Sequence, residues 1–346
     1  MKLSLAKAIV EASFDSQIAN RESREADRTV PYLVSGPGIG KTSTIRQIAT
    51  EHDWGCYILS LAQFDAAELA GIIALIDGDA HRVMPHWLRR IHEMAASYEV
   101  VVLFLDELPQ APVANMNVGR QLINEWRIGE FELPHNVVIC AAGNRMSDRA
   151  GTNNMPSHLK SCLMFLEIDP DVEDAVAYMV ANGGHEDVTG FLRARPEHAV
   201  KFDRDANANP DFRSWDRVST ILSWGLPQVA EVEAVAGTVG RPTTADFYGY
   251  RKMKSNMPDL DNVISNPDTA EVPHDAMILY ALASGLAYRM SQSNAGNILR
   301  YLKRLDQQEF VGFCLKDACN RDPEIKKSEA VRQWIINGGA DLFPPA

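Results

Sequence analysis

Short apolar runs rich in β-branched residues alternate with longer amphipathic segments between residue 29 and about residue 170. This alternation is typical of strand–helix–strand units that build a parallel sheet. The run Val-Val-Leu-Phe-Leu at 101–105 is apolar throughout, as expected of a strand covered by helices on both faces. The pattern predicts five strands: Thr29–Val34, Cys56–Leu61, Val100–Leu105, Val137–Ala142 and Met164–Ile168.

Helical periodicity is expected between these strands and at the start of the chain. Residues 1–15 predict an amphipathic helix, and further helices follow the first and third strands. The faces predicted to be apolar comprise Leu5, Ile9 and Ala12; Ile45, Ile48, Ala49 and His52; and Met116, Gly119, Ile123 and Trp126.

Beyond residue 170 the strand signal disappears and helical periodicity takes over. The aperiodic polar stretch 202–212 predicts a linker, and the stretch 254–273, rich in Pro, Asp and Asn, predicts a surface loop. We therefore expect a sheet-containing domain at 1–205, a helical domain at 206–300 and further helices at 301–346.

Composition narrows the classes of function. The 46 acidic and 34 basic residues give a net charge of −12, which disfavours nucleic acid as a partner. The longest weakly polar stretch, 276–288, is shorter than the about 20 residues of a membrane span, and the amino terminus lacks a signal-peptide core. Five cysteines without CxxC pairs support neither a disulfide framework nor a zinc ribbon. We expect a cytoplasmic protein.

The strongest chemical signal follows the first predicted strand and opens a helix. Glycines there let backbone N–H groups wrap a phosphate chain, Lys41 neutralises the β/γ oxygens, and Thr42 offers a hydroxyl to Mg²⁺. A Gly-Pro-Gly turn alone would not require the Lys-Thr pair. The strict pattern GxxxxGK[ST] has glycine where this chain has serine. The predicted nucleotide-binding residues are Ser35, Gly36, Pro37, Gly38, Ile39, Gly40, Lys41, Thr42 and Ser43.

Two adjacent carboxylates, Asp106 and Glu107, end the apolar strand 65 residues after Lys41. Carboxylates at the C-terminal end of a parallel strand face the ligand crevice. Asp106 would hold Mg²⁺, and Glu107 would polarise the water that attacks the γ-phosphorus. The alternative is a solvated acidic turn without a catalytic role, and the presence of the phosphate loop argues against it.

Both motifs, followed by a fourth strand that ends in Asn144, resemble those of the AAA+ ATPases. In that family the residue at this position helps to hold the attacking water, although a strand-terminal Asn could also cap a turn. An arginine opening a lid helix reaches the phosphates, and Arg213 occupies the matching place; the alternative is a surface cation. Further segments resemble the MoxR-like branch (dynein-related type): 61–71, 85–88, 127–134, 143–150, 191–197 and 212–215.

The resemblance implies a three-layer αβα P-loop NTPase core with a five-stranded parallel sheet and a helical lid. It implies that ATP and Mg²⁺ bind between the 35–42 loop and the lid. It also implies a hexameric ring that hydrolyses ATP to remodel or activate a protein client. Partners in that branch often carry a von Willebrand factor A-type domain, which a separate polypeptide would supply here. Residues 65–85 would contribute loops to a central pore, or else form plain core.

One departure from the family pattern concerns the arginine finger, which reaches into the neighbouring subunit's site. Cys162 stands at that position and cannot carry the charge. Arg149, Arg145 or Lys160 could replace the finger, in that order of preference, although a lysine lacks the fork of a guanidinium. Alternatively, Cys162 is a buried apolar residue and the cations are surface charges.

Two competing functions use the same phosphate loop. One is a nucleic-acid motor such as a helicase or translocase, which the acidic net charge disfavours. The other is a scaffold that assembles on ATP and turns over slowly, which the missing finger at Cys162 supports.

Overall fold

A computed structural model describes residues 1–20, 29–145, 153–203, 205–254 and 256–339. The chain divides into two compact units, Met1–Pro170 and Asp171–Ala346. No helix among the residues so described has both the length and the apolar character to cross a membrane.

The first unit is built on a parallel five-stranded sheet with the order β2-β5-β8-β1-β9. All five predicted strands are confirmed, each end within two residues of its predicted place. The strands are β1 (Val30–Ser35), β2 (Gly55–Ser60), β5 (Val101–Asp106), β8 (Val137–Asn144) and β9 (Leu163–Glu167).

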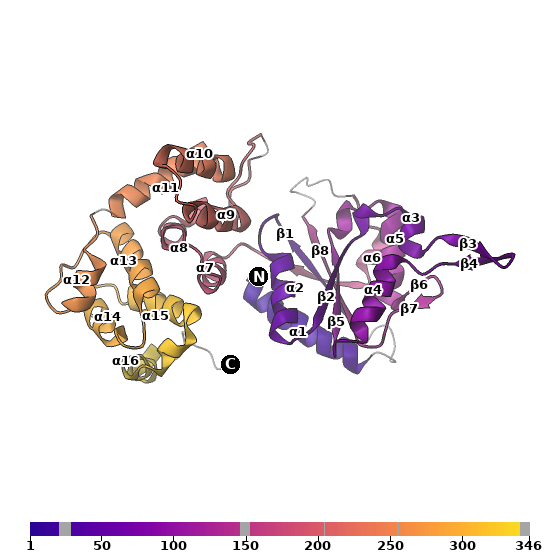
Figure 1. The fold of residues 1–346 in the computed structure, drawn as a ribbon, viewed down its shortest axis with the longest axis horizontal. Helices are drawn as coiled ribbons and strands as arrows, with labels where there is room; N and C mark the ends of the chain where they lie inside the picture. The colour runs from indigo at the N-terminus through magenta and orange to yellow at the C-terminus, as the bar shows by residue number, and fades with distance from the viewer. Residues whose placement is uncertain (21–28, 146–152, 204, 255, 340–346) are drawn as a thin grey trace. The chain divides into compact units, whose positions relative to one another are not determined.

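Helices cover both faces of this sheet, which gives the predicted three-layer αβα arrangement (Figure 1). On one face lie α1 (Leu3–Ala19) and α2 (Lys41–Glu51). On the other lie α4 (His86–Ala95) and α5 (Val113–Glu125), whose apolar residues share a core with alternate residues of the strands. With the helical second unit, this confirms the predicted fold class.

The predicted apolar face of α1 is wrong by one position. Its buried residues include Ala6, Val10 and Phe14, whereas Leu5 is 55% exposed. Gln17 on the same face exchanges two hydrogen bonds with the backbone of Ile139 in β8, N–H to Oε1 at 2.7 Å and Nε2–H to the carbonyl at 2.9 Å. Because this buried amide satisfies a strand's backbone groups, it sets the rotation of the helix.

Small elements that the apolar pattern did not predict connect the main ones. They include the hairpin of β3 (Ile73–Ile76) and β4 (Asp79–Arg82), whose turn residues Asp77 and Gly78 both have positive φ, as a type I′ turn requires. The others are α3 (Ala66–Ala70), β6 (Arg127–Ile128), β7 (Phe131–Glu132), α6 (Ser157–Lys160), and the short helices η2 (Leu61–Gln63) and η3 (Leu108–Gln110).

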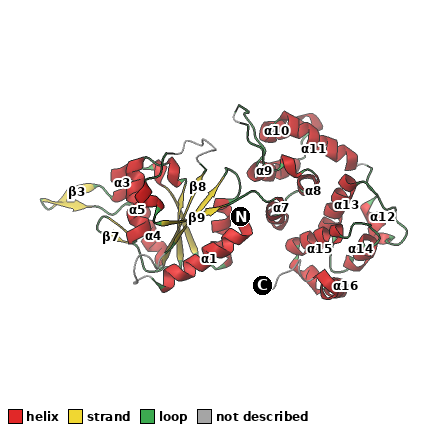
Figure 2. Cartoon of the chain, turned by 180° about the vertical axis from the view of Figure 1, so that it is seen from behind, coloured by secondary structure: helices red, strands yellow, loops and turns green. Residues whose placement is uncertain are grey.

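The second unit is helical throughout its described residues (Figure 2). The α-helices are α7 (Val172–Ala181), α8 (Glu186–Ala194), α9 (Phe212–Leu222), α10 (Gln228–Val239), α11 (Arg241–Lys254), α12 (Leu260–Ser265), α13 (Ala276–Arg289), α14 (Ala295–Leu302), α15 (Glu309–Arg321) and α16 (Glu329–Trp334). The remaining helical segments are η5 (Pro196–His198), η6 (Pro323–Lys327) and η7 (Ile335–Gly339).

The border between the units lies 35 residues before the expected domain boundary at 205. Helices α7 and α8 pack on α15 and α13 of the second unit. The buried Arg193 of α8 forms ion pairs with Asp317 of α15 and with Glu173 of α7. Buried residues from Leu260 to Val331 form one continuous core, so the compact unit has no break at 300.

The predicted surface loop at 254–273 contains a helix instead. Leu260 and Val263 of α12 are buried in that core, and Asp259 caps the helix with its carboxylate. The polar composition of this stretch favoured the prediction of a loop, although Leu260 and Val263 are three residues apart, as on one face of a helix.

Candidate functional site

Residues from three strands converge at the C-terminal edge of the sheet. The 35–42 loop follows β1, Asp106 ends β5, and Asn144 ends β8. In the sheet order, β8 and β5 separate β1 from β2, the strand that follows it in sequence. Such a crossover places a ligand crevice at the carboxyl end of the strands.

Two glycines give the loop its course. Gly38 and Gly40 have φ values of 72° and 101°, in the left-handed region that favours glycine. Gly40 immediately precedes α2, which begins at Lys41. The first N–H groups of a helix have no partner within it, so they are available to an anion held by the loop.

Lys41 connects the loop to β8. Its side chain is largely buried, and its ammonium donates to Ser35 Oγ at 2.8 Å, the Gly36 carbonyl at 3.0 Å and Asn144 Oδ1 at 3.1 Å. Ser35, the departure from the strict glycine pattern, thus supplies an acceptor for the lysine. Its hydroxyl also donates to the Gly36 carbonyl at 2.9 Å.

Thr42 and Asp106 lie together, as predicted for metal-holding residues. The Thr42 hydroxyl donates to Asp106 Oδ2 at 2.8 Å, and the Glu107 N–H donates to Asp106 Oδ1 at 2.9 Å. A hydroxyl and a carboxylate are hard oxygen donors, and Mg²⁺ is commonly held by one or two carboxylates together with substrate phosphates. These residues fit that ion.

Glu107 is exposed and has a φ of 55°, unusual for a residue with a side chain. Backbone in this region is costly and clusters at functional sites. Packing explains how it is held. The following Pro109 lies against β8 at Gly143, where an added Cβ would come within 2.4 Å of Pro109 Cδ and 2.3 Å of the Tyr32 hydroxyl. Sequence reasoning gave Gly143 no such role.

Two further polar residues near this edge were not predicted. Ser60, at the end of β2, is in register with Asp106, and Gln110 closes η3 just after Glu107. Ser60 Oγ and Gln110 Oε1 are buried without a hydrogen-bond partner in the described part of the chain. For Ser60 the available signal was a polar residue that ends an apolar strand, the same signal that identified Asn144.

Arg213 belongs to the second unit. It is exposed in the first turn of α9, where Asp211 and Ser214 form a capping box. Its predicted contact with phosphates stays a prediction.

Cys162 follows α6 and is partly buried against the core of the first unit. Its thiol donates to the His158 carbonyl at 3.2 Å and to Asn124 Oδ1 at 3.5 Å. Arg145 donates to the Ile168 carbonyl at 2.9 Å and to Asp169 Oδ1 at 2.8 Å. Lys160 is exposed at the end of α6, and Arg149 lies outside the described residues.

Residues 31–160 match the model of the family described as "ATPase family associated with various cellular activities (AAA)". The match runs from β1 through α6 and covers less than half of the chain. No curated protein matches the chain.

Among solved structures, the chain is similar to RuvB of Thermotoga maritima. One lysine-to-arginine mutant is 16% identical, with 83% of this chain and 82% of that chain covered and a TM-score of 0.39. Another structure, titled RuvB Holliday junction branch migration motor, has the same identity and coverage and a TM-score of 0.35.

Proposed function

We propose that the protein is an AAA+ ATPase of the MoxR type, which hydrolyses ATP to remodel or activate a protein client as a hexameric ring. The observation that carries this proposal is the meeting of Lys41, the Thr42–Asp106 pair and Asn144 at one edge of the sheet. Three strands far apart in the sequence deliver a cation, a hard-oxygen pair and an amide to one place. The AAA match over residues 31–160 supports the same class.

The chain's own groups suit phosphoryl transfer, which depends on positioning and charge stabilisation. Loop N–H groups bind the phosphates, and Lys41 neutralises the β/γ oxygens. Thr42 and Asp106 would hold Mg²⁺, which, when bound, offsets phosphate charge. Glu107 accepts the proton of the attacking water, and Asn144, already hydrogen-bonded to Lys41, orients that water. Arg213 would add a second cation to the phosphates.

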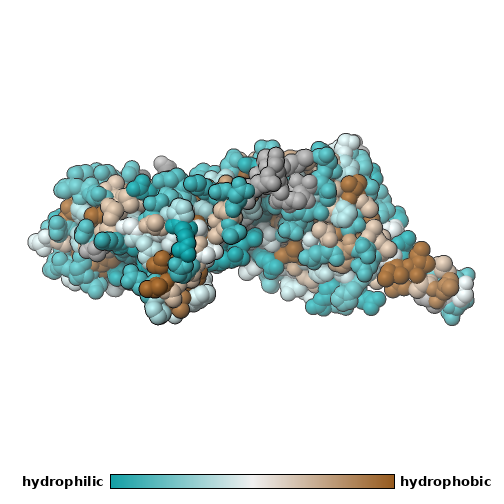
Figure 3. All heavy atoms as spheres, turned by 90° about the horizontal axis from the view of Figure 1, so that it is seen from above, coloured by the Kyte–Doolittle hydropathy of each residue, from teal (hydrophilic) through white to brown (hydrophobic). Residues whose placement is uncertain are grey.

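The β3–β4 hairpin supports a protein client. Ile73 and Leu75 are 61% and 80% exposed, and Ile72 beside them is also exposed. Apolar residues gather on this projecting hairpin (Figure 3). Exposed apolar patches of this kind are typical of interaction sites. We assign the hairpin to client contact, in line with the pore loop expected at 65–85; a separate protein with a von Willebrand factor A-type domain is a further candidate partner.

A slow, ATP-gated scaffold is the second candidate. The Cys162 thiol is held by His158 and Asn124, so the family's finger position presents no cation. Arg145 is engaged by Asp169 within its own chain. Turnover of the assembled protein separates this candidate from the first.

The decisive experiment compares two neighbouring carboxylate variants. Glu107→Gln should keep ATP affinity while slowing hydrolysis by about 10²–10⁴-fold, because an amide cannot accept the water's proton. Asp106→Asn should instead raise the Mg²⁺ concentration needed for ATP binding. We would measure affinity by calorimetry and turnover by phosphate release across a Mg²⁺ titration.

Glu99→Gln is the matched control, because that carboxylate is exposed and precedes β5, at the opposite end of the strand from Asp106. If Glu107→Gln and Asp106→Asn behave alike, the separate roles are wrong. The Glu107→Gln protein held with ATP is also the form in which to trap and identify the client.

A further inference from the structure

A pocket in the first unit lies at the foot of the β3–β4 hairpin and shares no residue with the proposed ATP site. It has a volume of about 360 Å³, and we call it the hairpin-foot pocket. Residues of β2, α3 and α4 and both ends of the hairpin line it. Its walls are mainly apolar, with contributions from Tyr57, Phe64, Met84 and Trp87, and Glu68 supplies a carboxylate.

Contacts within the chain fix the shape of this pocket. The Val83 N–H donates to the Ile72 carbonyl at 2.8 Å, which closes the base of the hairpin. Gly71 has a φ of 96°, and a Cβ added there would lie 2.5 Å from the Val83 carbonyl oxygen, so the close approach requires glycine. The buried Trp87 indole N–H donates to the Leu69 carbonyl at 3.1 Å, which holds the ring in the wall. The fold thus preforms the pocket, which lowers the entropic cost of binding there.

Apolar side chains continue from the pocket onto the hairpin. Ile72 and Val83 line the pocket and are 59% and 38% exposed, and the exposed Ile73 and Leu75 follow on β3. These residues belong to the apolar surface of the hairpin in Figure 3. A pocket that opens onto exposed apolar residues is typical of a site that takes a side chain of a protein partner.

The charge around the pocket is negative. Between residues 65 and 87 the chain carries one arginine and four exposed carboxylates: Asp65, Glu68, Asp77 and Asp79. The arginine, Arg82, donates to the Ala70 and Gly71 carbonyls at 3.3 and 2.9 Å. A negative surface favours basic partners and disfavours acidic ones. The partner that fits therefore combines lysine or arginine with an apolar side chain.

We propose that the hairpin-foot pocket recognises a basic, apolar segment of the protein client, with a branched or aromatic side chain in the pocket and a neighbouring lysine or arginine at Glu68. The apolar side chain covers Trp87, Phe64 and Met84, whose flexible thioether adapts to different shapes. Glu68 accepts the Asp65 N–H at 3.4 Å, and a carboxylate has capacity for a cation as well. This assignment rests on the proposed client contact of the hairpin and adds a chemical class of client segment to it.

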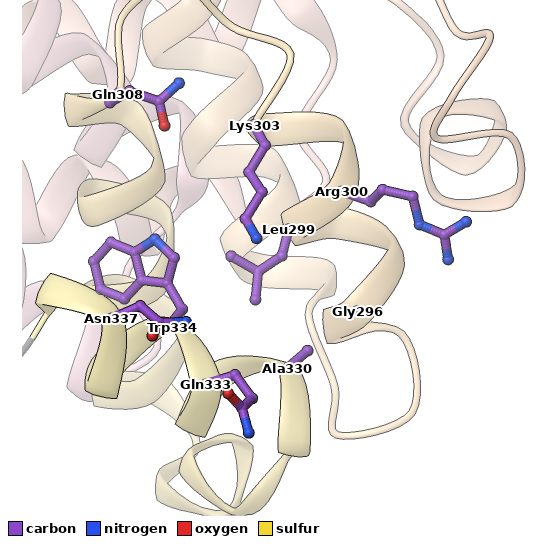
Figure 4. A pocket seen from close by; sticks show the side chains of 9 residues that line it. All are labelled: Gly296, Leu299, Arg300, Lys303, Gln308, Ala330, Gln333, Trp334 and Asn337. Carbon is purple, nitrogen blue, oxygen red and sulfur yellow. The ribbon is translucent and has the colours of Figure 1, made fainter.

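The pocket between α14 and α16 in the second unit has the opposite charge. It has a volume of about 610 Å³, and Lys303 and Trp334 face it from opposite walls (Figure 4). Arg300 points away from the cavity and pairs with Asp268 at 3.1 Å. An acidic peptide fits that pocket better than a basic one, so the charge of a bound peptide tells the two pockets apart.

The first test selects peptides on the full chain from a phage library that displays random heptapeptides. We expect the selected peptides to combine a branched or aromatic side chain with a neighbouring lysine or arginine. Acidic peptides would point to the α14–α16 pocket and overturn the proposal, as would the absence of any enriched class. Peptides that resemble the segment 72–75 and carry no basic residue would point to the hairpin of a second copy, and would also overturn it.

Charge exchange then locates the contact. A selected peptide labelled with fluorescein should bind Glu68→Lys at least about 10-fold more weakly than the wild type by fluorescence anisotropy. The same peptide with glutamate in place of its basic residue should recover the loss. Glu68→Gln, which keeps a capping group for α3, should weaken the original peptide as well.

Asp79→Lys is the matched control, because it makes the same change of charge on the hairpin at a residue that does not line the pocket. It should weaken the peptide less than threefold. Equal effects of Asp79→Lys and Glu68→Lys would mean that the general field of the surface attracts the peptide. That result, or unchanged binding to both Glu68 variants, overturns the assignment.

Failure of this assignment and failure of the proposed ATPase function give different results. Peptide affinity is measured without hydrolysis, and phosphate release by the wild type and Glu107→Gln measures ATP turnover separately. If turnover depends on Glu107 while Glu68→Lys leaves peptide binding unchanged, the assignment of the pocket alone is wrong. If the peptides bind as expected and no turnover depends on Glu107, the ATPase proposal is wrong and the peptide site stands.

Discussion

The Lys41 ammonium is held by acceptors of its own chain. Its acceptors at Ser35, Gly36 and Asn144 fix it between the loop and β8, so little side-chain entropy is left to lose on binding. A phosphate oxygen can replace one of these neutral acceptors with a charged one, which makes a stronger hydrogen bond.

Lys41→Ala should therefore weaken ATP binding by at least about 1.5–3 kcal/mol, the usual contribution of a charge-assisted hydrogen bond. Isothermal calorimetry with Mg²⁺ measures this directly. Arg46→Ala on the exposed side of the same helix is the control and should leave the affinity unchanged. Unchanged affinity in the Lys41→Ala protein would refute the assignment of the loop.

Cys162 is the second residue whose substitution separates the proposals. Charge develops on the γ-phosphoryl group, and a thiol cannot offset it. If the position is a vacant finger site, Cys162→Arg should raise turnover in the assembled protein, measured by phosphate release. Cys162→Ser is the control, because it removes the thiol without adding a cation.

A folded Cys162→Arg protein with unchanged turnover would argue against a vacant finger site. Fast wild-type hydrolysis that survives Arg149→Ala, Arg145→Ala and Lys160→Ala singly would place the finger elsewhere in the chain.

At the scale of elements, the start of α8 depends on a histidine. His185 Nδ1 accepts a hydrogen bond from the Asp187 N–H at 3.1 Å, the part an N-cap side chain plays. Burial lowers the pKa of His185, although the nearby Asp187 and Glu186 carboxylates act in the opposite direction. Lys254 and Arg251 add to the lowering.

A neutral cap of this kind predicts an acid-dependent loss of stability. Because the folded pKa of His185 is lowered, its contribution is present above the unfolded value of about 6.5 and is lost as the pH falls through the folded pKa. Protonation removes the acceptor, and a lost N-cap costs about 0.5–2 kcal/mol. His185→Asn keeps an acceptor that does not titrate.

Urea unfolding at pH 7.5 and pH 5.5 checks this. The wild type should lose more stability between the two pH values than His185→Asn does, by up to the cost of the cap. Parallel losses in the two proteins would mean that other groups carry the acid dependence.

Elements differ in how far the sequence predicts them. The central strands β1, β5 and β8 were predictable because each is an apolar run that both helical layers bury almost completely. The outer strands β2 and β9 are only partly buried, but each still has a short apolar run. The face of α1 was not, because the Gln17–Ile139 hydrogen bonds, a tertiary feature, decide its rotation. The β3–β4 hairpin was not predicted because its apolar residues Ile73 and Leu75 are exposed, whereas the apolar residues of a strand are usually buried.

The candidate site follows the same division. Glycines, Lys41, Thr42 and the Asp-Glu pair have fixed spacing along the chain, so the sequence predicts them. Ser60 and Gly143 matter through neighbours on other strands, and no spacing in one sequence encodes those neighbours. Register across a sheet becomes visible only in the structure.

The whole molecule consists of two units with separate cores, joined after Pro170. Ligand binding raises the stability of the unit that binds it. ATP with Mg²⁺, bound through Lys41 and Thr42, should therefore raise the unfolding temperature of the first unit. Whether the second unit responds depends on Arg213, its one residue predicted to reach the phosphates.

We expect ATP to raise the unfolding temperatures of both units in the wild type, and of the first unit alone in Arg213→Ala. Differential scanning calorimetry with and without ATP and Mg²⁺ measures both, and Trp215→Phe and Trp87→Phe, monitored by fluorescence, assign each transition to a unit. Arg217→Ala, exposed on the same helix, is the matched control and should respond like the wild type. If Arg213→Ala also responds like the wild type, Arg213 is a surface cation, and the second unit reaches the nucleotide through other residues or not at all.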